Sequence, residues 1–464
     1  MKTARHRSGV DMLHGTLWDK MVLFAVPLAL TSVLLQLLNA ADVAVLGRYV
    51  SKEAMAAVGN NVPIVGLLVS LCVGLSIGAN VLVARYIGMR DSHKVVKAVH
   101  TAFVMAVVFG LVACLAAEMG ASRMMLWLEV PEAVQPHALT YLRYFLLGLP
   151  FISIFNFLAA VFRSKGDTKT PMYALLAATA FNICGNLVAV LLFELGTAGV
   201  ALSTVMANAV AAGVLFFCLL RSQETVHLRF NQLSDFDFDA MRIMIRIGLP
   251  AGIQSMVFSL SNLVVQSAIN SLGPDVMAAS AAAFAVEINI FCCINAFGLA
   301  ATTFVSQNYG AGNLDRCRRA TWVSFWINMA VTVVLVALVI GFGHELLGMF
   351  SDSQEVIALG MIRLWYVALP EPLSVLMETV SDAMRGYGYS MPPAVVTLVC
   401  ICSVRLLWVY TIFAYESSYE VLMAVYPVSW FITSVALVWL YVQHQKNLAL
   451  RFAGQPKTED GVGG

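Results

Sequence analysis

The feature that most constrains the fold of this chain is its series of long apolar segments, which turn and charge signals separate. Most are about 20 residues or longer, the length that an α-helix needs to cross a bilayer. Of the 464 residues, 60% are hydrophobic and 12% are charged, whereas soluble domains carry about 25% charged residues. We therefore predict an all-α polytopic membrane protein with twelve transmembrane helices. The predicted segments are residues 21–44, 56–84, 98–120, 138–162, 171–193, 198–220, 245–270, 277–304, 320–343, 357–383, 393–414 and 420–443.

The basic residues predict the orientation of these helices. If both termini lie on one side, that side holds 22 of the 28 lysines and arginines, and Arg405 lies inside a segment. The opposite side holds Arg48, Lys52, Arg123, Arg143 and Arg363. Because loops rich in lysine and arginine stay in the cytoplasm, we expect both termini to be cytoplasmic and the protein to lie in an inner or plasma membrane.

The two halves of the sequence repeat each other at a nearly constant offset. Pro27 and Asn39 return in the second half, at one and the same spacing, as Pro250 and Asn262. Six helices per half give the two halves the same orientation, which predicts a pseudo-two-fold axis along the membrane normal. The expected parts are an N-terminal six-helix lobe (1–220), a cytoplasmic linker (221–242), a C-terminal six-helix lobe (243–445) and a cytoplasmic tail (446–464).

Several short motifs follow one another in a fixed order. They are Pro27 with Asn39 to Asp42 and Gly47, Ala54 to Gly59, Arg163 to Pro171, Gln307 to Gly312 and Arg385 to Gly388. Together they resemble the multidrug and toxic compound extrusion (MATE) family, towards its bacterial branches, over about residues 15–445. The resemblance implies two six-helix lobes around a V-shaped cavity and the export of organic cations and other drugs against a proton or sodium gradient.

Asp42 is the strongest functional candidate because it lies inside the first predicted helix. A carboxylate in a membrane must face protein or water, find a partner or take a proton. A single acid that binds either a proton or an organic cation is the minimum device for antiport, and the resemblance places the family's helix-1 acid here. The alternative is a solvated residue near the outer end of the helix. Pro27 removes a backbone hydrogen bond and predicts a kink in the same helix. The resemblance implies that, in some relatives, this bend is linked to protonation of the helix-1 acid; the alternative is a static kink.

Polar residues on later helices are candidate partners of Asp42. Asn182 and Asn186 are four residues apart and share one helix face, and their oxygens suit a small cation or a carboxylate's surroundings. The resemblance adds Thr204 and, less directly, Asn156 to this pocket, and it makes Asp42, Asn182, Asn186 and Thr204 a possible sodium site. In the family's sodium site a carboxylate stands at the position of Asn186, whereas this chain has an amide there. We therefore favour protons as the coupling ion. Interhelical hydrogen bonding is the alternative role for each of them.

The C-terminal half carries a different set of polar residues, because the position equivalent to Asp42 is Val265. Asn262, Gln266 and Asn270 lie four residues apart and form an amide stripe on one predicted helix, which Gln254 extends. The secondary candidates in this half are Gln254, Asn262, Gln266, Glu287, Glu378, Asp382 and Arg405. Glu378 and Asp382 lie near the cytoplasmic end, where they either carry protons or only neighbour Arg385. The role of Glu287 is open. The resemblance suggests that Arg405 pairs with an internal acid.

We therefore predict a monomeric multidrug antiporter that works by alternating access. Its expected partners are small cationic amphiphilic substrates and the lipid of the surrounding membrane. No cofactor or firm metal site is expected, and the net charge of +1 offers no basic field for nucleic acid. One alternative is a lipid-linked precursor flippase of the same superfamily, although such proteins carry more basic cavity residues. The other is a membrane-embedded enzyme, which the eight histidines argue against because all lie in loops or near helix ends.

Overall fold

The computed structural model describes residues 9–127, 134–229 and 235–453, and within these ranges the chain is helical without a strand. Eleven helical segments are long and apolar enough to cross a membrane, and α4 with α5, which meet at 47°, form a twelfth. The predicted all-α polytopic fold is therefore confirmed. The helices of the first half are α1 (Trp18–Tyr49), α2 (Lys52–Gly88), α3 (Ser92–Trp127), α4 (Gln135–Leu146), α5 (Leu149–Ser164), α6 (Lys169–Leu191) and α7 (Gly196–Arg221).

The second half repeats this order with more breaks. The helices are α8 (Phe238–Asn270), α9 (Pro274–Gly310), α10 (Leu314–Gly341), α11 (Gly343–Gly348), α12 (Gln354–Arg363), α13 (Glu371–Gly386), α14 (Met391–Thr397), α15 (Ser403–Trp408), α16 (Tyr419–Met423) and α17 (Val425–Ala453), with π-helical turns at Leu364–Ala368, Leu398–Cys402 and Val409–Phe413. α17 continues into the segment expected to be a tail because Leu448 still packs into the core of this half.

Local chemistry sets the ends of several helices. Ser51 begins α2 by accepting a hydrogen bond from the Ala54 amide, and Asn313 begins α10 by accepting one from the Arg316 amide. Such side chains replace the partners that the first turn of a helix lacks. α4 and α5 each have a proline in the first turn, where a missing amide donor costs nothing.

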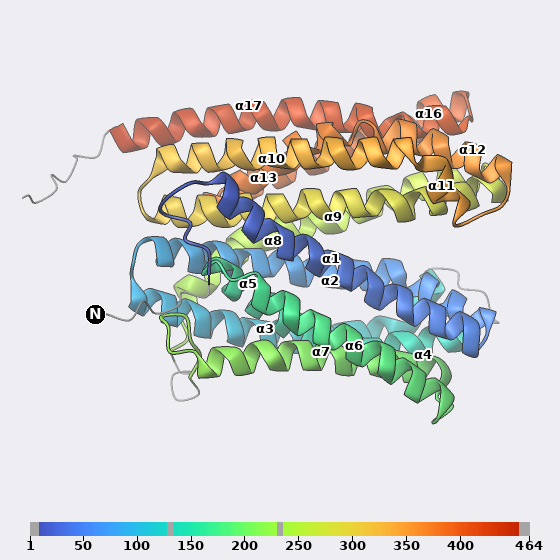
Figure 1. The fold of residues 1–464 in the computed structure, drawn as a ribbon, viewed down its shortest axis with the longest axis horizontal. Helices are drawn as coiled ribbons and strands as arrows, with labels where there is room; N and C mark the ends of the chain where they lie inside the picture. Colours follow the sequence, from blue (N-terminus) through green and yellow to red (C-terminus); the bar gives the residue numbers. More distant parts are fainter. Residues whose placement is uncertain (1–8, 128–133, 230–234, 454–464) are drawn as a thin grey trace, which may run out of the picture.

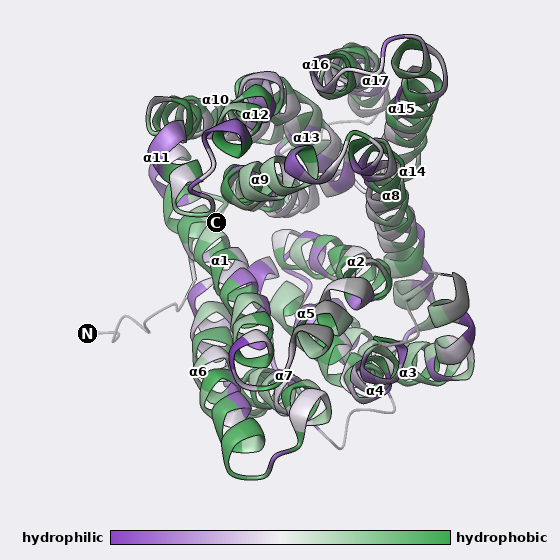
Figure 2. Ribbon diagram, turned by 90° about the vertical axis from the view of Figure 1, so that its right-hand side faces the viewer, coloured by the Kyte–Doolittle hydropathy of each residue, from purple (hydrophilic) through white to green (hydrophobic). Residues whose placement is uncertain are grey.

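The helices form two bundles (Figures 1 and 2). We call α1–α7 the first bundle and α8–α17 the second bundle. Two clusters of buried side chains hold the first bundle together, one around Phe157 and one around Leu142. The second bundle is organised around Phe304 and around Ile294. The linker between the bundles, from the end of α7 to the start of α8, includes residues 230–234, which lie outside the described ranges.

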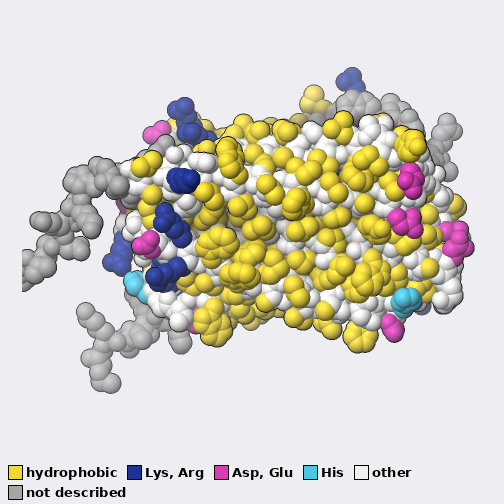
Figure 3. Space-filling view, turned by 90° about the horizontal axis from the view of Figure 1, so that it is seen from above, with side chains coloured by type: hydrophobic (Ala, Val, Ile, Leu, Met, Phe, Trp, Pro, Cys, Tyr) yellow, Lys and Arg dark blue, Asp and Glu magenta, His cyan; other side chains and the backbone are white. Residues whose placement is uncertain are grey.

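The outer surface has an apolar belt with charged ends (Figure 3). α1 begins and α17 ends at the same end of the molecule, shown at the left in Figure 1. Most lysines and arginines in the view of Figure 3 lie at this end, and the acidic residues are more frequent at the other. We call it the basic end; it carries Arg85, Lys94, Arg163, Arg316 and Arg385.

α1 belongs to both bundles. Before Pro27, Met21 and Phe24 are buried in the core of the second bundle. After Pro27, Val45 and Leu46 are buried in the core of the first bundle. The proline, whose missing amide weakens the helix, therefore lies close to the point where α1 changes partners.

Contacts between the bundles lie in the half of the molecule nearer the basic end. A Cβ added to Gly78 of α2 would collide with the Met244 carbonyl of α8, so glycine permits close helix packing there. Asn80 Nδ2 donates to Thr303 Oγ1 at 2.9 Å, and Ser306 Oγ donates to the Val81 carbonyl at 2.6 Å. Two further side-chain hydrogen bonds join α1–α7 to α8–α17 in this half. The bonds nearest the basic end are those of Gln307 with Ser164 and of Arg85 with Tyr387.

Candidate functional site

Asp42 lies beyond Pro27, in the part of α1 that packs in the first bundle. Its exposed fraction is 1%. None of the ion pairs in the described part of the chain includes it. The alternative of a solvated helix-end acid does not fit this burial. A carboxylate removed from water without a basic partner must be stabilised by hydrogen bonds or by protonation.

Three side chains of α6 and α7 donate hydrogen bonds to the Asp42 carboxylate. Asn186 Nδ2 donates to Oδ1 at 2.7 Å and Asn182 Nδ2 donates to the same oxygen at 3.1 Å. Thr204 Oγ1 donates to Oδ2 at 2.6 Å. The fold thus brings together Asp42, Asn182, Asn186 and Thr204, which the sequence analysis had grouped, and both carboxylate oxygens have partners.

The packing of α6 against α7 positions these partners. Asn182 and Asn186 are one helical turn apart on α6, and Asn182 Nδ2 also lies 3.0 Å from Thr204 Oγ1 of α7. Gly185 makes the close approach possible, because a Cβ there would lie 2.5 Å from Ser203 Oγ. Ser203 in turn donates to the Asn182 carbonyl at 3.1 Å. The amides are therefore held by neighbouring helices as well as by Asp42.

Tyr141 of α4 is a member of this site that sequence reasoning missed. Its side chain is 5% exposed and interacts with the Asp42 carboxylate. Two whole helices, α2 and α3, separate it from α1 along the chain. Only the packing of α4 in the first bundle brings it to the carboxylate, so no local pattern could have signalled it.

The other two residues proposed for this half lie apart from the carboxylate. Asn156 of α5 donates its amide to the Ile152 carbonyl at 2.9 Å, and no hydrogen bond in the described ranges joins it to Asp42. Pro27 lies within α1, and Thr31 Oγ1 donates to its carbonyl at 2.7 Å. Pro27 can therefore affect Asp42 only through the shape of the helix.

The arrangement can exchange one small cation or a proton. Ionised Asp42 accepts three hydrogen bonds, and a protonated carboxyl would have one oxygen that donates instead. Asn186 Oδ1 is buried without a hydrogen-bond partner, which leaves an acceptor beside the carboxylate. The described residues contain no group of three or more His, Cys, Asp or Glu side chains arranged for a metal.

The C-terminal half has no matching carboxylate site. Val265, at the position equivalent to Asp42, is buried in the core of the second bundle. Asp382 pairs with Arg385 near the basic end, and Arg385 Nη2 donates to Gln254 Oε1 at 2.8 Å. Glu378, one turn before Asp382, is only partly buried in this conformation. Of the two roles expected for Asp382, proton carrier or neighbour of Arg385, its position in the structure agrees with the second.

Apart from Gln254, which Arg385 contacts, the predicted amide stripe on α8 divides into two groups. Gln266 and Asn270 are exposed and bond to each other at 2.9 Å. Asn262 accepts a hydrogen bond from Arg405. Arg405 is fully buried and lies over the rings of Phe258 and Tyr426. The expectation that Arg405 pairs with an internal acid is wrong in the described ranges, because an amide and two aromatic rings surround it instead.

Glu287 of α9 forms a buried ion pair with Arg363 of α12. Arg363 Nη1 also donates to Ser280 Oγ at 2.7 Å, and the exposed fractions of Glu287 and Arg363 are 5% and 4%. Arg363, which the sequence places within the predicted segment 357–383 on the side opposite the termini, thus has a buried acidic partner. α12 begins at Gln354, so Arg363 lies inside a span, where an arginine is tolerated because it is paired.

Glu371 was overlooked by sequence reasoning. It is 4% exposed in the first turn of α13, its Oε2 has no hydrogen-bond partner, and it lies close enough to Glu287 for the two carboxyls to repel each other. It lies inside the predicted segment 357–383, between prolines at 370 and 372, but was not singled out as a candidate. The second bundle thus holds two buried acids near one ion-paired arginine.

Comparison with known proteins agrees with this architecture. The family model described as MatE matches the chain twice, over residues 27–188 and 250–411. The "Probable multidrug resistance protein YoeA" of Bacillus subtilis is 26% identical over 92% of this chain and 94% of its own. The "Multidrug export protein MepA" of Staphylococcus saprophyticus is 22% identical over 75% and 77%.

Solved structures show the same fold. A structure described as "MATE in the bent conformation" superposes with a TM-score of 0.88 and 19% identity, covering 96% of this chain and 99% of that one. The two regions that the family model matches begin at Pro27 and at Pro250, which are equivalent positions in the internal repeat. Two matched copies on one twelve-span scaffold cover most of the chain, and the chain therefore belongs to the MatE family of membrane transporters rather than to any class of enzyme.

Proposed function

We propose that this transporter exports cationic amphiphilic drugs across an inner or plasma membrane in exchange for protons, with Asp42 as the residue for which proton and cargo compete. The observation that carries the proposal is the isolation of Asp42. It is buried among uncharged hydrogen-bond donors and has no ion-pair partner in the described ranges. A group in that position gains most from binding a proton or a cation.

The small-molecule cargo is supported by the relatives, whose printed names describe multidrug resistance and multidrug export. The cationic character is our inference from the sign of Asp42. An ionised carboxylate attracts a cation and a protonated one does not, so protonation releases the cargo. A ligand can drive such a change only through its different affinities for the two states.

Alternating access is supported by how the bundles meet. Their hydrogen bonds and glycine contacts lie in the half nearer the basic end. With lysine and arginine facing the cytoplasm, the basic end is the cytoplasmic one and this conformation is closed on that side. Export then requires a second conformation in which these contacts separate.

Sodium is the second candidate for the coupling ion. The unpartnered Asn186 Oδ1 beside Asp42 favours it, because carbonyl and carboxylate oxygens suit hard cations. Against sodium, Asp42 is the one carboxylate of the group formed with Asn182, Asn186 and Thr204. A sodium ion there would have a single anionic ligand.

The experiment is a transport assay in vesicles that contain the purified full chain. Movement of a cationic dye is followed while either a proton gradient or a sodium gradient is imposed. We expect dye accumulation with the proton gradient alone. Accumulation that follows only sodium would replace the proton with sodium, and no accumulation of several cationic dyes under either gradient would contradict the proposed cargo.

A further inference from the structure

The segment before α1 lies across both bundles at the basic end. We call residues 9–17 the strap. It contains no helix or strand, yet Met12 is 1% exposed and packs in the core of the second bundle. Its backbone carbonyls face α9 and α10, and its first residues reach the turn between α5 and α6.

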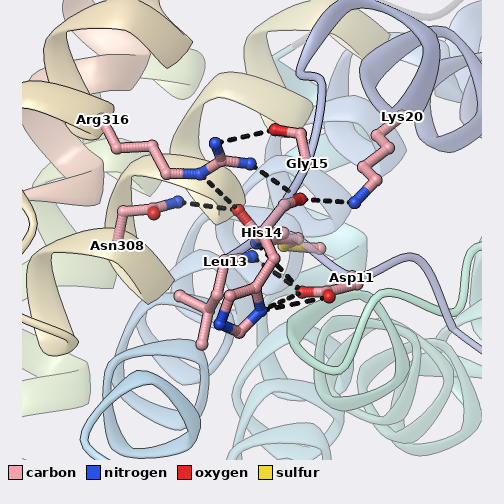
Figure 4. A network of polar contacts seen from close by, with 8 residues as sticks. Asp11, Leu13, His14, Gly15, Lys20, Asn308 and Arg316 are labelled. Carbon is pink, nitrogen blue, oxygen red and sulfur yellow. Dashed lines mark hydrogen bonds and ion pairs between the residues drawn. The ribbon is translucent and has the colours of Figure 1, made fainter.

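Arg316 of α10 holds the strap to the second bundle. Its guanidinium donates to three strap positions: Nε to the Met12 carbonyl at 3.2 Å, Nη2 to the His14 carbonyl at 3.0 Å and Nη1 to the Gly15 carbonyl at 2.9 Å. Figure 4 shows the guanidinium reaching the backbone of His14 and Gly15. Asn308 of α9 adds a bond to the Met12 carbonyl at 3.1 Å.

The other end of the strap contacts the first bundle. The Val10 amide donates to the Gly166 carbonyl at 3.0 Å. Gly166 has a φ of 92°, a value that glycine adopts without strain, and a Cβ there would collide with the Val10 backbone. A Cβ on Gly9 would likewise lie 2.5 Å from the Lys165 carbonyl. Both glycines are thus required for the strap to lie flat on this turn.

Hydrogen bonds of Asp11 and Lys20 fix the conformation of the strap. Asp11 Oδ1 accepts hydrogen bonds from the amides of Leu13 and His14 at 3.0 and 3.3 Å, and Lys20 of α1 donates to the His14 carbonyl. This turn directs the carbonyls of residues 12, 14 and 15 towards Arg316 (Figure 4). The contact between the strap and α10 therefore depends on the shape of the strap as well as on Arg316.

We propose that the strap is a latch that holds the two bundles together at the basic end, with Arg316 as its positioning residue. The proposal rests on the proposed function in one respect, that the bundles separate at this end during transport. Separation of α9 and α10 from the α5–α6 turn pulls the strap at both of its ends. Apart from its continuation into α1 and the Lys20 bond to His14, one backbone hydrogen bond joins the strap to the first bundle, whereas four side-chain bonds join it to the second. The Val10–Gly166 contact therefore breaks first.

The test measures the distance between the bundles in the full chain. Spin labels on encoded ketone side chains replace the exposed residues His93 of α3 and Lys446 of α17, which leaves the nine native cysteines in place. Arg316→Gln removes the guanidinium bonds. Arg319→Gln is the matched control, because it removes the same charge one helical turn later. The Arg319 side chain is exposed and makes no hydrogen bond or ion pair in the described ranges.

We expect Arg316→Gln to raise the ratio of long to short distances at least about tenfold, since hydrogen bonds from charged groups are among the stronger ones. Arg319→Gln should match the wild type. Equal distributions in all three proteins would overturn the latch. If Arg316→Gln does not accumulate, deletion of residues 2–15 removes the same contacts with Arg316 intact, and an unchanged distribution there would also overturn it. A wild type with only the short distance under every gradient would instead contradict alternating access itself.

Discussion

Phe24 of α1 packs edge-on against Phe304 of α9, with ring centroids 5.7 Å apart. The contact joins a helix of the first bundle to the core of the second bundle. Asp42 lies further along the same helix, among Asn182, Asn186 and Thr204 of the first bundle. A change in the shape of α1 between Phe24 and Asp42 therefore alters how the two bundles are joined, and Pro27 lies in that stretch.

The first prediction concerns Asp42. Asp42→Asn keeps the size of the side chain and removes its charge, so gradient-driven efflux of a cationic dye should be lost while the protein level stays unchanged. Dye binding by the wild type should strengthen as pH rises, because deprotonation gives Asp42 the negative charge that attracts the cation. In the variant the affinity should not change with pH. Binding measured by fluorescence anisotropy over a range from mildly acidic to mildly basic pH checks this.

The control for this change is Asp275→Asn, which removes an exposed acid at the start of α9 and should leave efflux as in the wild type. Wild-type efflux in a well-expressed Asp42→Asn protein would contradict the proposed mechanism. It would move the search to Glu371 and Glu287.

The second prediction concerns the coupling ion. Asn186→Asp places a second carboxylate 2.7 Å from Asp42 Oδ1, where the amide now lies. Two adjacent carboxylates bind a small cation much better than one, so we expect dye efflux to become sodium-dependent. Efflux with and without a sodium gradient at constant pH is the measurement. Asn156→Asp is the matched control, because the hydrogen bond of Asn156 in the described part of the chain is to the Ile152 carbonyl of its own helix. Sodium dependence that is already complete in the wild type would show that protons were the wrong choice.

The third prediction separates the buried acids of the second bundle. Glu287→Gln leaves Arg363 buried without its counter-charge and should destabilise the protein by about 3–5 kcal/mol. Glu371→Gln removes an acid that has no ion-pair partner in the described ranges and should be neutral or stabilising. Thermal unfolding in detergent, followed by tryptophan fluorescence, compares them. The double change Glu287→Gln with Arg363→Met should recover part of the loss; equal stability of the two single variants would show that the pair contributes nothing.

The fourth prediction concerns topology. In a background whose nine cysteines are replaced by alanine, Gln223→Cys, at an exposed position just after α7, should not react with a membrane-impermeant maleimide added to intact cells. Asp352→Cys, exposed at the other end of the molecule between α11 and α12, should react. Both should react after the cells are opened. Labelling of Gln223→Cys from outside would reverse the orientation.

The sequence predicted those parts of this protein that depend on local patterns. Segment length and composition gave the twelve spans, and the four-residue spacing of Asn182 and Asn186 gave a shared face. A carboxylate inside an apolar segment identified Asp42, because burying a charge is costly wherever it occurs. These signals need only one helix at a time.

The residues that were missed depend on contacts between distant helices. Tyr141 reaches Asp42 only through the packing of α4. Glu371 lies close to Glu287 only because α13 packs against α9. Arg363 lies inside the predicted segment 357–383, but its burial and its ion pair were not predicted. Its partner Glu287 is 76 residues away, a separation that no periodicity reports.

The contacts of the strap also impose an order on biosynthesis. Met12 meets Asn308 across 296 residues of chain, and a ribosome that adds about 5–20 residues per second needs roughly 15–60 s to make that interval. During this time the beginning of α1 enters the membrane without the helices that later bury Met21 and Phe24. α1 is therefore made long before α9 and α10, and it is among the last of the described helices to complete its packing.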